Sequence, residues 1–247
     1  MAINWIESEI IEHTHWTDTL SSLRFKGNVL PYKAGQFTKV GLKIDGEVIS
    51  RPYSYVSAPE DGFLEIVYVS VPDGILTPEL QKLKIDDKIL VMDKATGFFV
   101  MDEVPDGKNL WMLATGTGLG VFISLLKTDN PWKRFEKIVL VHCARFGNEL
   151  IYQEQIESFN KKYGDQFTYI KSATREKVDD CLGIRIPQAI EDNSFEKIAN
   201  TEINKDSQFM ICGNPDMIND TVEILNKSGL ERNRRSKPGN ITLEKYW

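Results

Sequence analysis

Residues 110–120 read Leu-Trp-Met-Leu-Ala-Thr-Gly-Thr-Gly-Leu-Gly, an apolar run that ends in a glycine-rich turn. The run predicts a buried strand, and the apolar residues after the turn predict a helix. Glycines in such a turn let the backbone approach a pyrophosphate, and the start of the helix offers free N–H groups and a positive dipole end. Because the turn lacks the ending of a P-loop and Val121 interrupts the dinucleotide fingerprint, a tight structural turn is an equal alternative.

The same pattern continues toward the C-terminus. Residues 137–142, 167–171 and 208–212 predict further strands, and helical stretches follow from about residue 149 and from Pro215. Strands that alternate with helices indicate a parallel sheet with right-handed crossovers. We therefore predict an α/β nucleotide-binding domain over residues 102–247, beginning in the turn-rich segment 102–107.

Residues 1–101 show a different sequence pattern, with short β-rich runs such as 37–42 and 64–69. Regularly spaced turns between such runs are typical of an antiparallel barrel. One helix interrupts this pattern, with Thr77 as its expected N-cap and Pro78 as its first helical residue. The turn signals are Ala34-Gly35, Asp45-Gly46, Asp61-Gly62 and Asp73-Gly74.

Composition supports two globular domains, because the chain has 247 residues of which 41% are apolar. The net charge of −6 disfavours general nucleic-acid binding. The uncharged run 110–126 is shorter than the roughly 20 apolar residues of a membrane span, and acid near the start argues against a signal peptide. Three widely spaced cysteines argue against a disulfide framework and against a local metal-ligand set. We expect a soluble, cytoplasmic, metal-free protein without membrane or nucleic-acid partners.

Three arginines lie near the predicted carboxyl ends of parallel strands. The second strand ends His142-Cys143-Ala144-Arg145, with no acid at the position that binds the ribose hydroxyls of NAD. Arg175 follows the next strand, and Arg185 comes ten residues later. Arginines at this edge suit the 2′-phosphate of NADP. Three solvated surface arginines are the alternative.

A second candidate site lies in the barrel, where residues 51–55 read Arg-Pro-Tyr-Ser-Tyr. Strand alternation places Arg51, Tyr53 and Tyr55 on one face and Ser54 on the other. A tyrosine could stack on a flat ring while the hydroxyl of Ser54 bonds its edge. Residues 74–77 form a turn before a helix, which suits an anion. A polar barrel rim with a capped helix is the alternative.

Taken in order, these features resemble a known family. They are Arg51-x-Tyr53-Ser54, the turn 74–77, Gly116-Thr117-Gly118, Cys212-Gly213-Asn214-Pro215 and the aromatic C-terminus. The chain closely resembles bacterial ferredoxin/flavodoxin–NADP reductases over essentially its whole length. The resemblance implies an FAD-binding barrel followed by an NADP-binding α/β domain. Val121 departs from it, because the family usually has proline there.

The resemblance also implies roles for individual residues in the flavin site. Tyr53 would lie against the isoalloxazine, Ser54 would bond near flavin N5, and Tyr55 belongs to the same cofactor-binding segment. Tyr246 would cover the other face of the isoalloxazine, and Trp247 would stack on the adenine. The FAD phosphates would be held by Arg51 and by the turn residues Gly74, Ile75, Leu76 and Thr77.

For the nucleotide, the resemblance implies that Thr117, Gly118 and Gly213 receive the pyrophosphate region. Cys212 would lie beside the nicotinamide, and Glu244 is a candidate proton relay. The phosphates of NADP would be bound by Arg145, Arg175 and Arg185.

The implied activity is hydride exchange with NADP(H) through FAD and single-electron exchange with ferredoxin or flavodoxin, by a monomer. Such carriers are acidic, and the basic cluster of Arg232, Arg234, Arg235 and Lys237 could guide them. A solvated loop is the equal alternative for this cluster. Rival activities on this scaffold are a free-flavin or ferric-chelate reductase and a flavin-bearing electron-transfer subunit of a larger complex. His13 and His15 lack metal-ligand spacing, and His142 is expected to be a hydrogen-bonded core residue.

Overall fold

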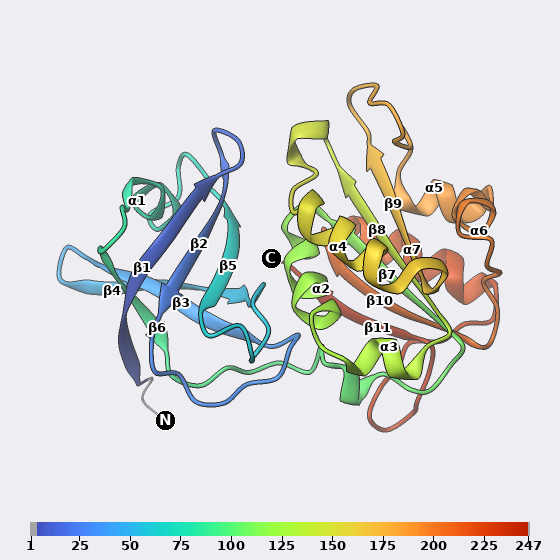
Figure 1. Cartoon of the computed structure of the whole chain (residues 1–247), viewed down its shortest axis with the longest axis horizontal. Coiled ribbons are helices and arrows are strands. Elements are labelled where there is room, and N and C mark those ends of the chain that lie inside the picture. The colour runs from blue at the N-terminus through green and yellow to red at the C-terminus, as the bar shows by residue number, and fades with distance from the viewer. Residues whose placement is uncertain (1–3, 247) are drawn as a thin grey trace. The chain divides into compact units, whose positions relative to one another are not determined.

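The computed structural model of this chain describes residues 4–246. It divides into two compact units, Met1–Val100 and Met101–Trp247. Figure 1 shows that the first is built on an antiparallel sheet and the second on a parallel sheet with helices. Each unit has its own hydrophobic core.

The N-terminal unit is a six-stranded antiparallel sheet in the order β4-β3-β6-β1-β2-β5. Tyr55, the residue after β4, forms a bridge with Ile66 of β5, and the Val56 amide donates to the Glu65 carbonyl at 2.8 Å. Because β4 and β5 are the two edge strands, these contacts close the sheet on itself. The strands are β1 (Trp5–His15), β2 (Leu20–Lys26), β3 (Phe37–Ile44), β4 (Glu47–Ser54), β5 (Leu64–Val69) and β6 (Lys88–Met92).

The core of this unit gathers the alternate apolar residues of its strands, among them Phe25, Ile66 and Val91. The short helix α1 (Thr77–Lys82) packs on that core through Leu80. The β3–β4 connection is the predicted Asp45-Gly46 turn. Both of its residues have positive φ, 51° and 89°, as a tight two-residue hairpin requires.

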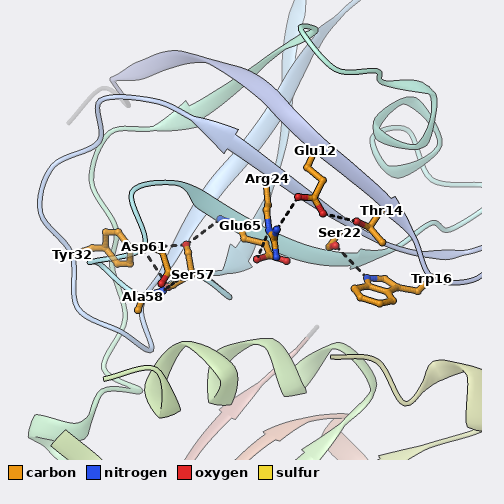
Figure 2. Close-up of polar contacts among 10 residues, drawn as sticks. All are labelled: Glu12, Thr14, Trp16, Ser22, Arg24, Tyr32, Ser57, Ala58, Asp61 and Glu65. Atoms are coloured by element: carbon orange, nitrogen blue, oxygen red, sulfur yellow. Dashed lines mark hydrogen bonds and ion pairs between the residues drawn. The ribbon is translucent and has the colours of Figure 1, made fainter. Parts of the chain in front are cut away.

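One carboxylate is buried in this unit. Glu65 of β5 accepts a hydrogen bond from Arg24 Nε at 3.0 Å, and Arg24 Nη1 reaches Glu12 at 2.7 Å (Figure 2). Removing Arg24 would take away the ion-pair partner of a buried carboxylate, which is far more costly than losing an exposed pair. The ion pairs therefore favour one register for β1, β2 and β5.

The C-terminal unit has five parallel strands in the order β11-β10-β7-β8-β9. The inner strands are buried along almost their whole length, which explains their continuous apolar runs. The described chain ends close after a fifth strand of this sheet, Ile241–Lys245. The strands are β7 (Asn109–Thr115), β8 (Lys137–Ala144), β9 (Phe167–Ala173), β10 (Ser207–Gly213) and β11 (Ile241–Lys245).

Helices cover both faces of this sheet. On one face, α5 (Ile186–Glu191), α6 (Ser194–Ala199) and α7 (Pro215–Lys227) share a core with the strands. Figure 1 shows α2 (Leu119–Leu126), α3 (Asn130–Arg134) and α4 (Gln153–Tyr163) along the other face. Every residue of α2 is buried, in keeping with a sequence in which Ser124 is the one polar residue. Within residues 4–246, no helix is both long and apolar enough to cross a bilayer.

Two local predictions differ from the structure. The Thr77 hydroxyl accepts from the Val71 amide at 2.9 Å, so it fastens the preceding loop and does not cap α1. The helix expected from residue 149 begins only at Gln153, because Tyr152 adopts a left-handed conformation with φ 60°. A short 3₁₀ turn, Gly147–Glu149, takes the place of its first turn.

Candidate functional site

The glycine-rich turn after β7 packs against the turn after β10. A Cβ on Gly118 would stand 2.6 Å from the Cys212 carbonyl oxygen, and one on Gly213 would overlap the Thr115 hydroxyl. Gly213 also has φ 132°, a conformation that side chains rarely adopt, so the two turns can interlock only through glycine. Gly116 has φ 53° with nothing within 4 Å of its Cβ position. That open side leaves room for a ligand to approach the backbone.

Thr115 ties the two turns together. Its hydroxyl accepts from the Asn214 amide at 2.8 Å, and the Asn214 side chain then caps α7 by accepting two backbone N–H bonds at 2.9 and 3.1 Å. Sequence reasoning placed Asn214 in a motif but missed Thr115. A threonine at the end of an apolar strand carries no signal of such a contact.

His142 of β8 supports the first turn from inside the sheet. It is fully buried, and its Nε2 lies 3.1 Å from the Gly116 carbonyl oxygen, which can only accept a hydrogen bond. Burial lowers the pKa of His142 to about 4, so the ring is neutral near pH 7. The expectation of a hydrogen-bonded core histidine is confirmed.

The three predicted phosphate-binding arginines lie at the carboxyl ends of the strands. Arg145 follows β8, and the Arg175 amide, two residues beyond β9, donates to the Arg145 carbonyl at 2.9 Å. Arg185 lies close enough to Cys143, at the end of β8, for its charge to oppose the rise that burial causes in the thiol's pKa. All three arginines are exposed. Within residues 4–246 no carboxylate forms an ion pair with any of them.

Two nearby carboxylates bond to backbone amides. Glu149 accepts from the Arg145 amide at 2.8 Å and from the Phe146 amide at 3.2 Å, and Glu176 accepts from the Gly147 amide. They therefore shape the loop that carries Arg145. Sequence reasoning missed both acids. The partners of Glu149 are three and four residues away, whereas the contact of Glu176 with Gly147 forms only because β8 and β9 pair.

Cys212, Glu244 and Tyr246 come together at the end of β10. Cys212 and Glu244 are register partners, and the Tyr246 amide donates to the Gly213 carbonyl at 3.1 Å. Burial raises the pKa of the Cys212 thiol well above its ordinary value, the charge of Glu244 adds to this, and a hydrogen bond with the Tyr246 side chain opposes it. The thiol is thus neutral, buried and next to the last described residue. Trp247 lies outside the described residues.

The barrel presents its predicted residues on β4. Arg51 is exposed, its Nη1 donates to the Ser50 carbonyl at 2.8 Å, and it has no ion pair with a carboxylate of residues 4–246. Tyr53 is partly buried and meets the ring of Tyr68 edge-on, with centroids 6.5 Å apart. Burial raises the pKa of Tyr53 to about 12, and the charge of Arg51 opposes this rise. Ser54 is buried.

Tyr55 corrects the prediction for this segment. Its side chain is fully buried, with its ring 4.5 Å from that of Tyr32. The backbone of Tyr55 closes the barrel against β5, which turns the side chain inward. It has no exposed surface with which to contact a cofactor, so it is a core residue.

The strand segment is anchored just beyond Tyr55 by polar contacts that sequence reasoning missed. The Ser57 hydroxyl accepts from the Glu65 amide at 3.0 Å and lies 3.1 Å from the Tyr32 hydroxyl. Asp61 caps the adjacent turn by accepting from the Ala58 amide at 3.0 Å. Figure 2 shows these contacts beside the Arg24–Glu65 pair.

The turn at residues 74–77 has an exposed side and a buried side. The Gly74 amide donates to the Val71 carbonyl at 2.8 Å and closes the turn. Ile75 is 60% exposed, which is unusual for a large apolar side chain, whereas Leu76 is part of the barrel core. The exposed side chain of Ile75 gives this turn an apolar surface.

The basic cluster is partly neutralised. Arg235 pairs with Glu103, and Lys237 pairs with Glu231. Arg232 and Arg234 are exposed, and neither has an ion pair with another described residue.

Comparisons with known proteins cover both units. The family model of the oxidoreductase FAD-binding domain matches residues 8–95, and that of the oxidoreductase NAD-binding domain matches residues 112–223. These matches confirm the predicted order of an FAD domain followed by a nicotinamide-nucleotide domain.

Relatives that match along the whole chain support the same assignment. The chain is 42% identical over 246 residues to the flavodoxin/ferredoxin–NADP reductases of Shigella flexneri and of Escherichia coli K12, covering 99% of each chain. A crystal structure of a ferredoxin–NADP⁺ reductase from Neisseria gonorrhoeae with bound FAD and NADP matches with a TM-score of 0.93 at 33% identity, covering 99% of both chains. The chain therefore belongs to the flavodoxin/ferredoxin–NADP reductase family.

Proposed function

We propose that this protein exchanges hydride with NADP(H) through bound FAD and exchanges single electrons with ferredoxin or flavodoxin. The observation that carries the proposal is the set of three exposed arginines at the carboxyl edge of the parallel sheet, which form no ion pair with a carboxylate of residues 4–246. They lie at the same edge of the sheet as the interlocked glycine turns, in a chain of this family. Bound FAD supplies the chemistry that joins a two-electron donor to one-electron carriers.

The nucleotide half of the proposal rests on charge and open backbone. Arg175 and Arg185 would bind the 2′-phosphate, and Arg145 would contribute a further phosphate contact. The pyrophosphate would meet the turn Gly116–Gly118, including Thr117, with Gly213 keeping the second turn close enough to frame it. Guanidinium groups already paired to carboxylates would fit this role poorly, and these three are not.

The flavin half uses the exposed parts of the barrel segment. Arg51, which pairs with no carboxylate in the described part of the chain, and the backbone of Gly74 to Thr77 would hold the FAD phosphates. The exposed side chain of Ile75 would gain an apolar contact, and the ring of Tyr53 would lie against the isoalloxazine. Ser54 would hold a hydrogen bond at flavin N5.

The end of the chain would act as a cover. Tyr246 bonds to the thiol of Cys212, the residue proposed to lie beside the nicotinamide. The nicotinamide can reach Cys212 only after Tyr246 moves, so Tyr246 would gate its entry and shield the flavin until then. Glu244, the register partner of Cys212, would hold the proton exchanged with solvent.

The partner and setting follow from charge and chemistry. An acidic one-electron carrier would dock near Arg232 and Arg234, the two members of the basic cluster that lack ion pairs with described residues. We place the protein in the cytoplasm as a monomer. Its three cysteines are free, which suits a reducing compartment.

The deciding experiment is anaerobic reduction of the purified protein. We expect a yellow protein that NADPH bleaches much faster than NADH, and that then reduces ferredoxin or flavodoxin. A colourless preparation would overturn the proposal. Flavin that exchanges freely with solution, together with no carrier reduction, would favour a free-flavin reductase.

A further inference from the structure

His142 lies in an otherwise apolar stretch of β8, residues 138–144. Ile138 and Leu140 precede it on the same face of the strand, and all three side chains are fully buried. The imidazole brings two polar nitrogens into this setting, and only Nε2 has a hydrogen-bond partner among residues 4–246. Burying an unpaired polar nitrogen lowers stability, so packing alone would favour another apolar residue at this position. The bond made by Nε2 is therefore the reason to look for a role of this histidine.

That bond joins a rigid donor to a flexible acceptor. The partner of Nε2, 3.1 Å away, is the carbonyl oxygen of Gly116, which can only accept, so the ring carries its proton on Nε2 and donates. Gly116 can adopt many backbone conformations, and no atom of residues 4–246 lies within 4 Å of its Cβ position to select one. The hydrogen bond from the buried ring therefore helps to select the conformation of the turn.

A carbonyl group that is held in place also holds the N–H group next to it. The peptide bond between Gly116 and Thr117 is planar and trans, so its C=O and N–H groups point in opposite directions. Because the oxygen points toward the buried imidazole, the Thr117 N–H points away from it. Thr117 also lies in the first turn of the helical segment that continues into α2, where N–H groups have no partner within the helix. An N–H group in this position can donate to an anion at the turn.

Resting on the proposed function, we propose that His142 is a positioning residue for the coenzyme. Its Nε2–H holds the Gly116–Thr117 peptide in the orientation that presents the Thr117 N–H to the pyrophosphate. His142 itself touches no ligand, because its side chain is fully buried. A core residue of β8 thus sets part of the affinity for NADP.

The turn keeps a second hydrogen bond when the imidazole is removed. The Gly116 carbonyl oxygen also accepts from the Leu119 amide, at the end of the 3₁₀ turn Gly116–Gly118. Leucine or phenylalanine at position 142 would also remove the unpaired Nδ1 from the core. We therefore expect His142→Leu and His142→Phe to fold, with the peptide after Gly116 less firmly oriented.

The test separates the pyrophosphate from the rest of the coenzyme. Isothermal titration calorimetry of the FAD-bound protein at neutral pH gives dissociation constants for NADP⁺ and for adenosine 2′-monophosphate. The second ligand carries the adenine and the 2′-phosphate that Arg175 and Arg185 would bind, but it has no pyrophosphate. A variant that is damaged as a whole would lose both ligands, whereas a turn that is wrongly oriented would lose only NADP⁺.

Two further variants serve as comparisons. His142→Gln is the conservative change, because a glutamine amide is long enough to donate to the Gly116 carbonyl in place of Nε2. Leu140→Val is the matched control, since it changes a fully buried residue on the same face of β8, one that has no side-chain hydrogen bond to the turn.

In His142→Leu and His142→Phe, we expect the dissociation constant of NADP⁺ to rise about fivefold, as for one lost neutral hydrogen bond. The dissociation constant of adenosine 2′-monophosphate should stay at its wild-type value. His142→Gln should bind NADP⁺ as the wild type does. Leu140→Val should lower the unfolding midpoint and bind both ligands like the wild type.

Several results would overturn the inference and leave the proposed function intact. They are unchanged NADP⁺ binding in the apolar variants, an equal loss of both ligands, a His142→Gln variant as weak as His142→Leu, and the same selective loss in Leu140→Val. One folded apolar variant is enough for the comparison, because both lack the donor. A wild-type protein that binds neither NADP⁺ nor adenosine 2′-monophosphate overturns the proposed function as well.

Discussion

In the parallel-sheet unit, the proposed ligand surface consists of backbone and of exposed charged side chains. In the barrel, it consists of side chains that are partly buried in the core. In the first, Gly118 and Gly213 lock two turns together, and Arg175 and Arg185 are exposed and pair with no carboxylate of residues 4–246. In the second, Tyr53 packs on Tyr68, whose hydroxyl lies 3.0 Å from His13 Nε2. We therefore expect coenzyme preference to be separable from stability in the first unit, and flavin binding to be coupled to packing in the second.

The largest effect should come from the backbone of the parallel-sheet unit. Gly213→Ala forces a side chain into a φ of 132° and against Thr115. We expect it to lower the free energy of unfolding by about 3 kcal/mol, from strain together with the clash, and to abolish NADP binding. Gly229→Ala, just after α7, is the matched control, with φ 80° but open space, and should cost only about 1 kcal/mol. Equal losses in the two variants, by thermal or urea unfolding, would show that the turns are not interlocked.

The next largest effect should be on coenzyme preference, without a change in stability. Arg175→Ala with Arg185→Ala removes charge-assisted contacts worth about 1.5–3 kcal/mol each, not fully additive. Steady-state kinetics with a dye acceptor should show kcat/KM for NADPH falling on the order of 100-fold or more, with NADH use nearly unchanged. The unfolding midpoint should stay the same, because neither side chain has a partner among the described residues. Parallel losses with both coenzymes would remove these arginines from the 2′-phosphate site.

A smaller effect is expected where the chain ends. Deleting Tyr246 and Trp247 should loosen FAD by about 1 kcal/mol for each lost ring, by analogy with aromatic pairs. It should also uncover Cys212, so that nicotinamide binds more tightly and NADH use improves. FAD release and the spectral change on adding NADP⁺ are the measurements. If the truncated protein is less stable but FAD release and the spectral change on adding NADP⁺ are unchanged, the C-terminal residues only fill the core.

The smallest effect concerns the carrier. Arg232→Glu with Arg234→Glu should slow carrier reduction several-fold at low salt, because steering by exposed charge weakens as salt screens it. Reduction of a small neutral dye should be unaffected. Arg235→Glu serves as the comparison, since that arginine is already paired with Glu103 and should contribute less to steering. If the rate of carrier reduction is unchanged in all three variants, the carrier docks elsewhere.

The placement of much of the candidate site could be predicted because its signals are local. The turn Gly116–Gly118, Arg145 and Arg175 follow strand ends, and apolar runs identify strand ends well. Tyr55 was wrongly placed for an equally physical reason. Alternation assigns a face only within one strand, and Tyr55 lies where the sheet closes from β4 onto β5.

The sequence by itself determined the two-unit order, the parallel and antiparallel strand patterns, the glycine turns and the family, because each depends on residues close together in the chain. Only the tertiary structure decided that Arg24 neutralises a buried Glu65 and that Thr115 ties two turns together. It also decided that the Tyr68 hydroxyl lies within hydrogen-bond distance of both His13 and Gln81. These partners are separated by long stretches of chain, and their contacts exist only once the strands have paired in register. The periodicity and composition of the sequence do not specify how the strands pair.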